Sequence, residues 1–399
     1  MVAMAFFAAA WATAEELKRK EKAGLLKPQS KTMIIGQKVS IVEVLLAALT
    51  GFVLAFKIGG VFGHVEEVSP DPMGYLLSPK GNLIIGIIGL LAMGIQRYYE
   101  GKKQELPAPE TRTILVHPHE LIMEIVIVAA IGGFAGAKIF NALETWDDFI
   151  KDPIGNLTSS SGLTFLGGLI VATASLYFYG KKQKIPFKHM ADAAAPGILL
   201  AYGIGRIGCQ LAGDGDWGIY NMAYVSNPDG TLRQAIAADK ADALRMIAGG
   251  PYTYCKAPSW LPDWIVAMNY PHNVGNVGRA IAGCTGDFCT ALPVSVFPTP
   301  IYESISCILL FFVLWRLRFR LLKPLQVFGA YLVLSSAERF LVELIRVNTK
   351  YNLGFIQPTQ AELISVILFC VGIWLVFGYK DKEPVAQPAE ATAPLELEK

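Results

Sequence analysis

Residues 203–218, Gly203-Ile204-Gly205-Arg206-Ile207-Gly208-Cys209-Gln210-Leu211-Ala212-Gly213-Asp214-Gly215-Asp216-Trp217-Gly218, close an apolar run that begins at Ala194 and carries a single arginine. A guanidinium keeps its charge, so inside lipid it needs an anionic partner. Arg206 lies roughly two helical turns inside the run, and two aspartates follow where the run ends. The stretch predicts a membrane span with an anion-binding arginine near its outer end. The simpler alternative is a small-residue packing seam whose arginine reaches out to the interface.

The composition is that of a protein that crosses a membrane several times. Hydrophobic residues make up 53% of the 399 residues, charged residues make up 17%, and the mean hydropathy is +0.41. These values exclude an ordinary soluble domain. The net charge of +2 says little by itself, whereas the distribution of charge along the chain is informative.

Apolar runs recur along the whole chain and predict an all-α polytopic membrane protein with about nine spans. The first run is too short to cross a bilayer, so we expect a truncated first span whose upstream part is absent. The runs are 1–14, 41–63, 81–97, 121–142, 163–179, 191–212, 301–319, 325–345 and 360–378.

The loops between these runs alternate in charge. Lys and Arg gather in residues 17–40, 97–118 and 180–189 and after residue 315, whereas 64–80 (Glu66, Glu67 and Asp71) and 143–162 are acidic. Because an excess of Lys and Arg marks cytoplasmic loops, we expect loop 213–300 to form a small extracytoplasmic head. The C-terminus is then cytoplasmic, and the Pro-, Ala- and Glu-rich tail 379–399 is expected to be disordered.

Two segments about 80 residues apart repeat one another. Tyr98–Pro107 resembles Tyr177–Pro186, and Asp71–Gly74 resembles Asp152–Gly155. We therefore expect the two-span hairpin 38–107 to duplicate 116–186, with chance similarity of apolar spans as the alternative. The expected divisions are 1–37 (first span and basic loop), 38–107, 116–212 (core spans), 213–300 (head), 301–378 (C-terminal spans) and 379–399.

Three of the six cysteines, Cys255, Cys284 and Cys289, fall in the long polar loop. In an oxidising compartment they allow one disulfide and one remaining thiol. Cys284–Cys289 is the pairing we expect, although the sequence leaves the other pairings open. No CxxC pair occurs, and His272 is the one histidine nearby, so we expect no metal site.

Three motifs lie far apart in the chain. The first is Gly205–Gly208, followed by an acid and a glycine, and the second is Phe297–Glu303, which contains Pro-x-x-x-Tyr-Glu. The third is Glu338–Glu343, which contains Arg-x-x-x-Glu. Together, over Glu120 to Ile373, they resemble the prolipoprotein diacylglyceryl transferases.

The resemblance implies an enzyme of the bacterial cytoplasmic (inner) membrane that is active in lipoprotein biosynthesis. It implies transfer of the diacylglyceryl group from phosphatidylglycerol to the lipobox cysteine thiol of preprolipoproteins, with release of glycerol 1-phosphate. The partners are then phosphatidylglycerol, the preprolipoprotein signal peptide and membrane lipid, with no cofactor and no nucleic acid. Two alternatives stay open: an inactive relative that binds anionic lipid, and a membrane transporter.

Arg206 and Arg339 each lie seven residues before the outer end of an outward-running helix, roughly 10 Å inside the boundary. They are expected to share a lipid phosphate, with Glu343 one turn beyond Arg339. The expected catalytic residues are Arg206, Arg339, Asp214 and Glu343; the expected lipid-binding residues are Arg206, Arg339, Gly205, Gly208, Gly218 and Tyr302; and Asp216, Cys209, Glu303 and Leu166 are uncertain.

The chain departs from the family where a base is expected. Many members carry histidine or tyrosine before Gly-Gly, whereas Leu166 stands there in this chain. Asp214, Asp216 or Glu343 could take the thiol proton, and Asp214 is the acceptor we favour. Cys209 stands where the best-known members have asparagine, and we interpret it as a packing residue. The sequence does not specify the oligomeric state, the acyl preference or the effect of a truncated first span on activity.

Overall fold

The computed structural model describes residues 1–61, 63, 75, 78–159, 162–239, 254–255, 257, 260–346, 348, 351–352 and 357–380. It divides into two compact units, which we describe separately. The core unit comprises Met1–Lys27, Pro118–Val128 and Leu176–Lys399, and the hairpin unit comprises Pro28–His117 and Ala129–Ser175. The acidic residues Glu66, Glu67 and Asp71, the repeat Asp71–Gly74 and the tail from residue 381 lie outside the described residues.

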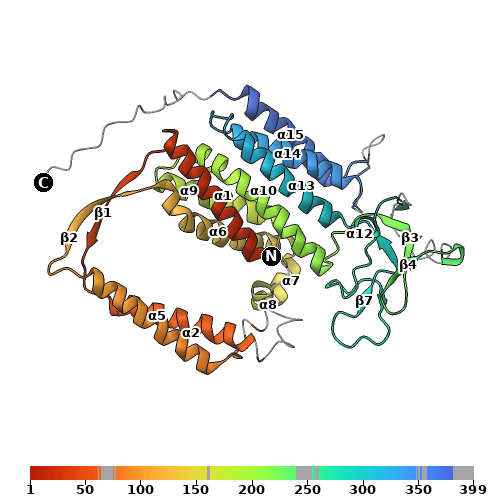
Figure 1. Cartoon of the computed structure of the whole chain (residues 1–399), viewed down its shortest axis with the longest axis horizontal. Coiled ribbons are helices and arrows are strands. Elements are labelled where there is room, and N and C mark those ends of the chain that lie inside the picture. Colours follow the sequence, from red (N-terminus) through yellow and green to blue (C-terminus); the bar gives the residue numbers. More distant parts are fainter. Residues whose placement is uncertain are drawn as a thin grey trace. The chain divides into compact units, whose positions relative to one another are not determined.

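Helices that lie side by side build the core unit (Figure 1). Helix α10 packs against α1 and α13, and α14 packs against α10, α13 and α15. Their bounds are α1 (Val2–Lys22), α10 (Phe187–Ala212), α13 (Thr299–Leu317), α14 (Gln326–Glu343) and α15 (Gln360–Ile373), which continues as the π-helical turn η2 (Trp374–Gly378).

Small residues on α10 let its neighbours approach closely. A Cβ on Gly197 would lie 2.7 Å from the carbonyl oxygen of Ala9 in α1, and a Cβ on Gly203 would lie 3.2 Å from the Cβ of Cys307 in α13. Such contacts bring helix backbones together where lipid supplies no hydrophobic drive. The apolar centre consists of Ala12, Ala195, Leu199, Cys307, Phe311, Leu314 and Val327.

A buried acid near the start of α10 fixes the start of α14. Asp192 accepts hydrogen bonds from the Lys20 ammonium at 3.1 Å and from the backbone N–H groups of Leu325 at 2.9 Å and Phe328 at 2.8 Å. No side chain of α14 itself caps its N-terminus. Asp192 therefore supplies, from α10, the acceptor that the first turn of α14 needs.

A second buried acid, Glu16 of α1, binds two arginines. Arg19 donates to it from Nε at 2.8 Å and from Nη2 at 2.6 Å, and Arg318 donates from Nη1 at 3.1 Å. The Arg318 guanidinium also stacks on Trp315, 3.2 Å from the ring centre. We call Glu16, Lys20, Asp192 and Arg318 the Asp192 cluster.

The head contains β-structure that the expected fold class did not include. Strand β3 pairs antiparallel with β4 and β8 and parallel with β5, and β6 pairs with β7. Short runs rich in Tyr, Val and Thr favour strands over helices. The elements are β3 (Tyr220–Ser226), β4 (Leu232–Gln234), β5 (Tyr254–Cys255), α12 (Asp263–Val266), β6 (Arg279–Ala280), β7 (Thr290–Ala291) and β8 (Val294–Val296).

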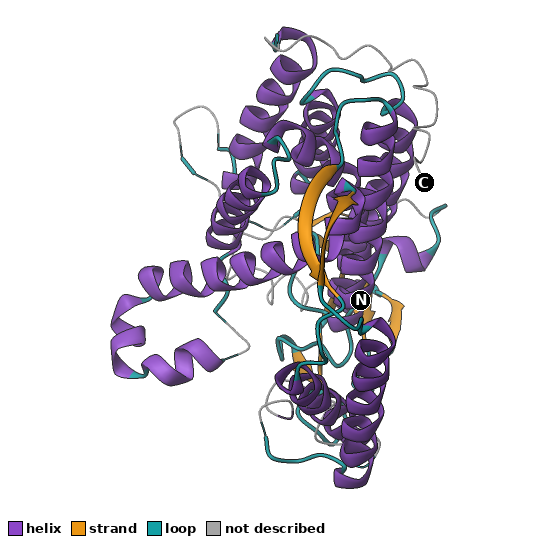
Figure 2. Cartoon of the chain, turned by 90° about the vertical axis from the view of Figure 1, so that its left-hand side faces the viewer, coloured by secondary structure: helices purple, strands orange, loops and turns teal. Residues whose placement is uncertain are grey.

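The hairpin unit contains a two-stranded ribbon that the sequence analysis also missed (Figure 2). Strands β1 and β2 pair antiparallel from Gln29↔Val116 to Ile35↔Glu110. Helices α6 and α9 each run from one unit into the other. The elements are β1 (Gln29–Ile35), α2 (Ile41–Val61), α5 (Leu83–Gln104), β2 (Glu110–Val116), α6 (Ile122–Glu144), α7 (Trp146–Lys151), α8 (Pro153–Thr158) and α9 (Phe165–Lys182). The short helix η1 (Pro118–Leu121), which precedes α6, belongs to the core unit.

In the first hairpin, α2 and α5 meet through glycines. A Cβ on Gly51 would lie 2.4 Å from the carbonyl oxygen of Gly89. Lys57 of α2 donates its ammonium to the carbonyl oxygens of Tyr75 at 2.8 Å and Ser78. The lysine thus satisfies carbonyl groups of the segment that leads to α5.

The second hairpin, formed by α6 and α9, has the same two kinds of contact: a close approach of glycines and a lysine bound to backbone carbonyl groups. A Cβ on Gly136 would lie 2.4 Å from the carbonyl oxygen of Gly167. Lys138 of α6 donates its ammonium to the carbonyl oxygens of Asn156 at 3.0 Å and Ser159 at 2.8 Å.

Five described helical segments are long and apolar enough to cross a membrane, so the chain has the helices of a multi-pass membrane protein. They are Ile41–Val61, Leu83–Gln104, Pro118–Glu144, Thr299–Leu317 and Gln360–Gly378. Helices α1, α9, α10 and α14 occur where the other spans were expected but are not among these five. The expected count of nine spans is therefore not confirmed.

Candidate functional site

The end of α10 positions the first functional side chain. The helix stops at Ala212, and Gly213 takes the left-handed conformation at φ +62°, donating its N–H to Cys209 O at 3.0 Å. A side chain at Gly213 would also collide with Asn273, whose Cβ lies 2.9 Å from the Cβ position. Glycine ends the helix here, so Arg206 is held in its last turns.

Backbone contacts tie the loop after α10 to α13 and α14. Gly218 donates its N–H to Phe297 O at 2.8 Å, and Ile219 donates to Ile345 O at 2.8 Å. The Thr299 hydroxyl donates to Asp216 O at 2.6 Å. A Cβ on Gly218 would lie 2.8 Å from Ile345 O, so only glycine fits this close approach. These hydrogen bonds hold the loop after α10 against the start of α13 and the end of α14.

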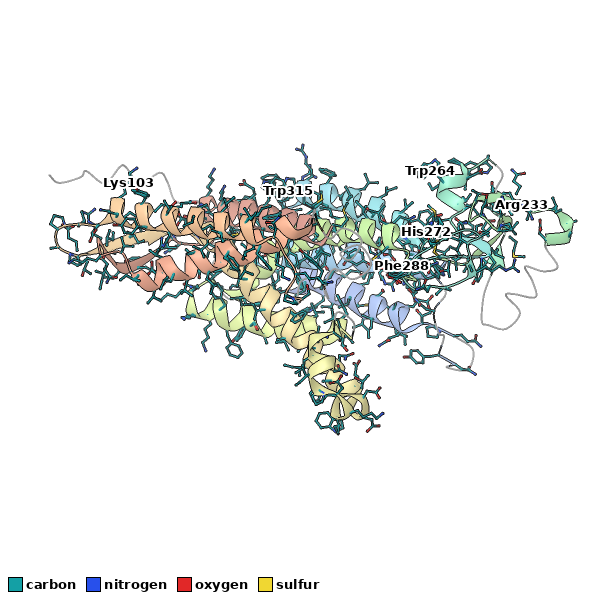
Figure 3. All side chains as sticks on the ribbon, turned by 90° about the horizontal axis from the view of Figure 1, so that it is seen from below. Lys103, Arg233, Trp264, His272, Phe288 and Trp315 are labelled. Atoms are coloured by element: carbon teal, nitrogen blue, oxygen red, sulfur yellow. A yellow bond between two sulfur atoms is a disulfide. The ribbon has the colours of Figure 1, made fainter. Side chains whose placement is uncertain are left out.

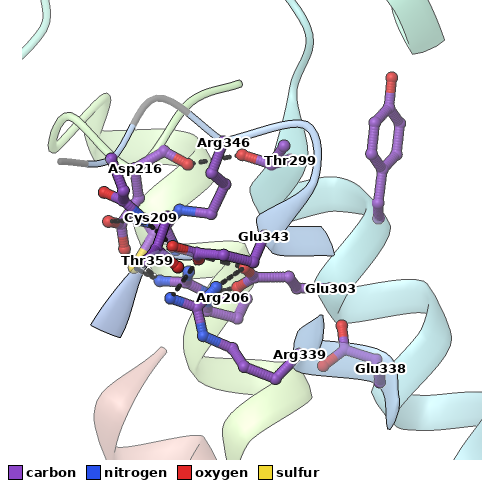
Figure 4. A network of polar contacts seen from close by, with 12 residues as sticks. Arg206, Cys209, Asp216, Thr299, Glu303, Glu338, Arg339, Glu343, Arg346 and Thr359 are labelled. Atoms are coloured by element: carbon purple, nitrogen blue, oxygen red, sulfur yellow. Dashed lines mark hydrogen bonds and ion pairs between the residues drawn. The ribbon is translucent and has the colours of Figure 1, made fainter. Parts of the chain in front are cut away.

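Glu303 of α13 is the centre of the site (Figure 4). Its carboxylate is fully buried and accepts hydrogen bonds from Arg206 Nε, from the Tyr202 hydroxyl at 3.1 Å and from Arg346 Nη1 at 3.3 Å. Arg339 Nη1 lies 3.6 Å away. The two arginines expected to converge, Arg206 and Arg339, therefore reach one carboxylate.

Asp216 forms the second bridge between arginines. One of its oxygens pairs with Arg206 Nη1 and the other with Arg346 Nη2. Its side chain is 33% exposed, whereas Glu303 is fully buried. Burial raises the pKa of the Asp216 carboxyl, but Arg346 and Arg206 outweigh this effect and hold its pKa below the ordinary value.

Arg346 is a residue of the candidate site that the sequence analysis did not name. It is the seventh residue after Arg339, where the outer end of this helix was expected, and this spacing places two side chains on one face of a helix. In the structure Arg346 follows the end of α14 and contacts both Asp216 and Glu303.

Glu343 pairs with Arg339 as expected, with 2.9 Å between Glu343 Oε2 and Arg339 Nη2. It is fully buried and also accepts a hydrogen bond from the Asn348 amide at 2.6 Å. Arg339 Nη1 and Arg346 Nε are buried and lack a hydrogen-bond acceptor among the described residues. We call Arg206, Asp216, Glu303, Arg339, Glu343 and Arg346 the Arg206 cluster.

Asp214 and Cys209 lie beside the Arg206 cluster. Asp214 accepts the backbone N–H of Asp216 at 3.3 Å, and the Cys209 sulfur accepts from Arg206 Nη1 at 3.4 Å. The ligand atoms of Cys209, Asp214 and Asp216 lie within 4.8 Å of one another. Each Asp216 oxygen is already paired with a guanidinium, so we do not propose a metal site.

Four further residues that the sequence assigned to the site, Gly205, Gly208, Tyr302 and Leu166, have different surroundings. A Cβ on Gly205 would meet no atom within 4 Å, while one on Gly208 would lie 3.3 Å from the Met1 Cβ. The Tyr302 hydroxyl donates to Ile265 O of α12 in the head. Leu166 is half exposed and belongs to the hairpin unit, so its position relative to the Arg206 cluster is not defined.

The head contacts the last turn of α10 through Tyr270, whose hydroxyl donates to Gln210 Oε1 at 2.7 Å. Burial raises the pKa of Tyr270 above its ordinary value, and Asp214 adds to the effect. The expected disulfide Cys284–Cys289 is confirmed; the Cys255 side chain lies outside the described residues. His272 Nδ1 lies 2.8 Å from Phe288 O in the segment that this disulfide closes (Figure 3).

Comparison with known proteins identifies relatives over most of the chain. A family model described as prolipoprotein diacylglyceryl transferase matches residues 83–378. Proteins named phosphatidylglycerol–prolipoprotein diacylglyceryl transferase are similar in Dehalococcoides mccartyi (27% identity over 261 residues, 64% of this chain and 75% of the relative), Leptospira interrogans (24% over 304 residues, 64% and 78%) and Clostridium tetani (26% over 255 residues, 64% and 79%).

Proposed function

The chain belongs to the prolipoprotein diacylglyceryl transferase family, and on this premise we propose that it transfers the diacylglyceryl group of phosphatidylglycerol to the cysteine thiol of a preprolipoprotein. The observation that carries the proposal is the convergence of Arg206, Arg339 and Arg346 on Glu303. Guanidinium groups bind phosphate through paired hydrogen bonds.

Unused hydrogen-bonding capacity supports phosphate binding at this place. Arg339 Nη1 and Arg346 Nε, buried and without acceptors among the described residues, could each donate to a phosphate oxygen. Gly205 leaves open space on the same helix as Arg206. Gly208, Gly218 and Tyr302, which the family resemblance adds to the lipid-binding residues, contact Met1, Ile345 and Ile265 and would act through the positions of these segments.

The proposed reaction is a displacement at carbon. The substrate thiol loses its proton, and sulfur attacks the glycerol carbon that bears the phosphate. A carbon–sulfur bond forms, the carbon–oxygen bond to phosphate breaks, and glycerol 1-phosphate leaves with the electron pair on its oxygen. The arginines stabilise the charge that grows on the departing phosphate, which is electrostatic catalysis by a preorganised site.

The acids of the site have two roles in this proposal. Glu303 and Glu343 hold the arginines in place, because both are fully buried and ion-paired. One carboxylate must also accept the thiol proton, since a thiol has a pKa near 8.5 and is mostly protonated at neutral pH. Asp214, Asp216 and Glu343 are the candidates.

The proposed topology places this site in the outer half of the membrane. The basic loops 17–40, 97–118 and 180–189 lie in the cytoplasm by the excess of Lys and Arg. The head 213–300 is then extracytoplasmic and the C-terminus cytoplasmic. The chain would reside in the bacterial cytoplasmic membrane, where both substrates occur.

We also propose that the α2–α5 hairpin is a duplicate of α6–α9. Lys57 and its acceptors Tyr75 O and Ser78 O correspond to Lys138 and its acceptors Asn156 O and Ser159 O at a constant separation of 81 residues. Lys57 donates in addition to Lys80 O at 2.9 Å. A shared lysine that binds the same two carbonyl positions is a more specific similarity than apolar composition. Superposition of the two hairpins in an experimental structure tests this, and opposite helix crossing would refute it.

The assay that tests the function measures glycerol phosphate released from phosphatidylglycerol with and without a lipobox peptide. Release that depends on the peptide cysteine separates a transferase from an inactive lipid-binding relative and from a transporter. A peptide with serine in place of the cysteine is the matched control. No release in the presence of the cysteine peptide would contradict the proposal.

A further inference from the structure

The Arg206 cluster is balanced in charge before any lipid arrives. It holds three guanidiniums, of Arg206, Arg339 and Arg346, and three carboxylates, of Asp216, Glu303 and Glu343. A phosphodiester brings one further negative charge into a site that is largely closed to water. Repulsion at short range in such surroundings is costly, so one carboxylate must give way to it.

Asp216 is the carboxylate that can leave its partners most easily. Glu303 is fully buried within α13, and Glu343 is fully buried and bound to Arg339 and Asn348. Asp216 is one third exposed and lies in the loop after α10. It also occupies the two guanidiniums, of Arg206 and Arg346, that a phosphate entering this side would need.

The backbone at Asp216 is fixed, so release of its carboxylate needs side-chain rotation only. The Thr299 hydroxyl holds the Asp216 carbonyl at 2.6 Å. The Asp216 side chain itself is one third exposed, so the carboxylate can turn toward its solvent side. After rotation the carboxylate stays within one side-chain length of the arginines.

We propose that phosphatidylglycerol activates its own general base: the lipid phosphate replaces the Asp216 carboxylate on Arg206 and Arg346, and the freed carboxylate then accepts the proton of the peptide thiol. The inference rests on the proposed function and adds an order of events to it. Lipid binds first, and the S–H proton then moves to Asp216. Sulfur attacks the diacylglyceryl carbon that bears the phosphate, and glycerol 1-phosphate departs while the arginines bind its phosphate.

The surrounding charges fit this exchange. Facing Asp216 are Arg206 and the Cys209 thiol from α10, Arg346 from beyond α14 and, on its own loop, Asp214. While both arginines are bound, the pKa of Asp216 stays below its ordinary value and the carboxylate is a weak base. Once the phosphate takes the arginines, that stabilisation ends, and Asp214 nearby favours the protonated form.

The test uses full-length protein in phosphatidylcholine nanodiscs that contain increasing mole fractions of phosphatidylglycerol. Asp216→Asn removes both the competing charge and the base, so two changes of opposite kind are expected. The apparent affinity for phosphatidylglycerol should rise several-fold, while the rate with a cysteine peptide should fall about 100-fold or more, as for loss of a general base. Asp239→Asn, which changes an acid paired with Arg233 in the head, should alter neither value.

A selenocysteine peptide sharpens the test. A selenol is ionised at neutral pH and needs no base, so it should restore most of the rate of Asp216→Asn. Weaker lipid binding by this variant, or no rescue by the selenol, would overturn the inference. Rescue confined to Asp214→Asn would assign the base to Asp214 instead. If the wild-type protein releases no glycerol phosphate, the proposed function itself fails, which is a separate result.

Discussion

The two ends of helix α10 carry charged clusters that contain the same residue types but differ in burial and in how completely their hydrogen bonds are satisfied. In the Asp192 cluster, near the start of α10, Lys20 and Asp192 are fully buried. The Asp192 carboxylate accepts three hydrogen bonds, from Lys20 and from the backbone of Leu325 and Phe328. In the Arg206 cluster, near the end of α10, Asp216 and Arg339 are about one third exposed, and buried guanidinium atoms lack acceptors among the described residues.

The difference shows how the same residue types serve structure at one end and ligand binding at the other. A closed polar network rigidifies a core and offers a ligand nothing to bind. An incompletely satisfied network loses free energy in the unliganded protein and recovers it when a ligand supplies the missing acceptors. Substitutions at the two ends of α10 should therefore fail in different ways.

The largest effect is expected at the end of α10 that binds phosphate. Arg206→Ala and Arg339→Ala should each reduce transfer by about 1000-fold or more, the scale seen when a catalytic arginine is lost from a phosphate site. The unfolding temperature should fall less than in Asp192→Asn, because Glu303 keeps two other guanidinium partners when either arginine is removed. Arg316→Ala, at the other end of α13, should keep wild-type transfer. If Arg206→Ala lost its fold instead, the distinction between the clusters would disappear.

The next effect is a loss of stability at the start of α10. Asp192→Asn leaves the Lys20 charge buried without a partner, which costs about 3–5 kcal/mol. The fraction that remains folded should transfer at a rate within about twofold of wild type, as measured per folded molecule beside a denaturant titration. Because Lys20→Met removes the unpaired charge, the double variant with Asp192→Asn should recover most of the stability. A fully stable but inactive Asp192→Asn protein would contradict the comparison.

The sequence predicted that Arg206 and Arg339 meet, and the structure brings both to Glu303, although α14 ends at Glu343 and not near Arg346 as expected. Arg346 escaped because it follows the helix and resembles an ordinary boundary residue. Glu303 was named, but a sequence cannot show that one carboxylate gathers three guanidiniums. The strands of the head were missed because their short runs depend on pairing with distant segments. Asp216 and Asp214, two residues apart, could be separated only by their contacts.

Acid should weaken the Arg206 cluster slightly through Asp216. Its pKa is lower in the folded protein, so its ion pairs contribute fully above the unfolded-state pKa of about 3.9. That contribution is lost as the pH falls through the lower folded-state pKa. In Asp216→Asn the free energy of unfolding should therefore fall less steeply with decreasing pH than in the wild type. The difference should be less than about 1 kcal/mol, because the Asp216 side chain is one third exposed. Denaturant titrations from pH 2 to pH 6 measure it, and identical curves would show that the pairs add no stability.

The smallest effect is expected from the hairpin unit, at the position where many relatives carry a histidine or a tyrosine. If Asp216 accepts the proton, Leu166→His adds a second base to a reaction that already has one, and the rate should stay within about twofold of wild type. The pH–rate profile should keep its shape, because the group that titrates is unchanged. Leu166→Ala is the control for the loss of the apolar side chain, which is half exposed in the structure. The measurement is a pH–rate profile of wild type and both variants with one lipobox peptide. A Leu166→His enzyme that gains rate near pH 7, with a new inflection close to the histidine pKa of about 6.5, would show that this position reaches the thiol. Leu166 would then stand where a base can act, and the exchange of Asp216 at the arginines would be insufficient to replace that base.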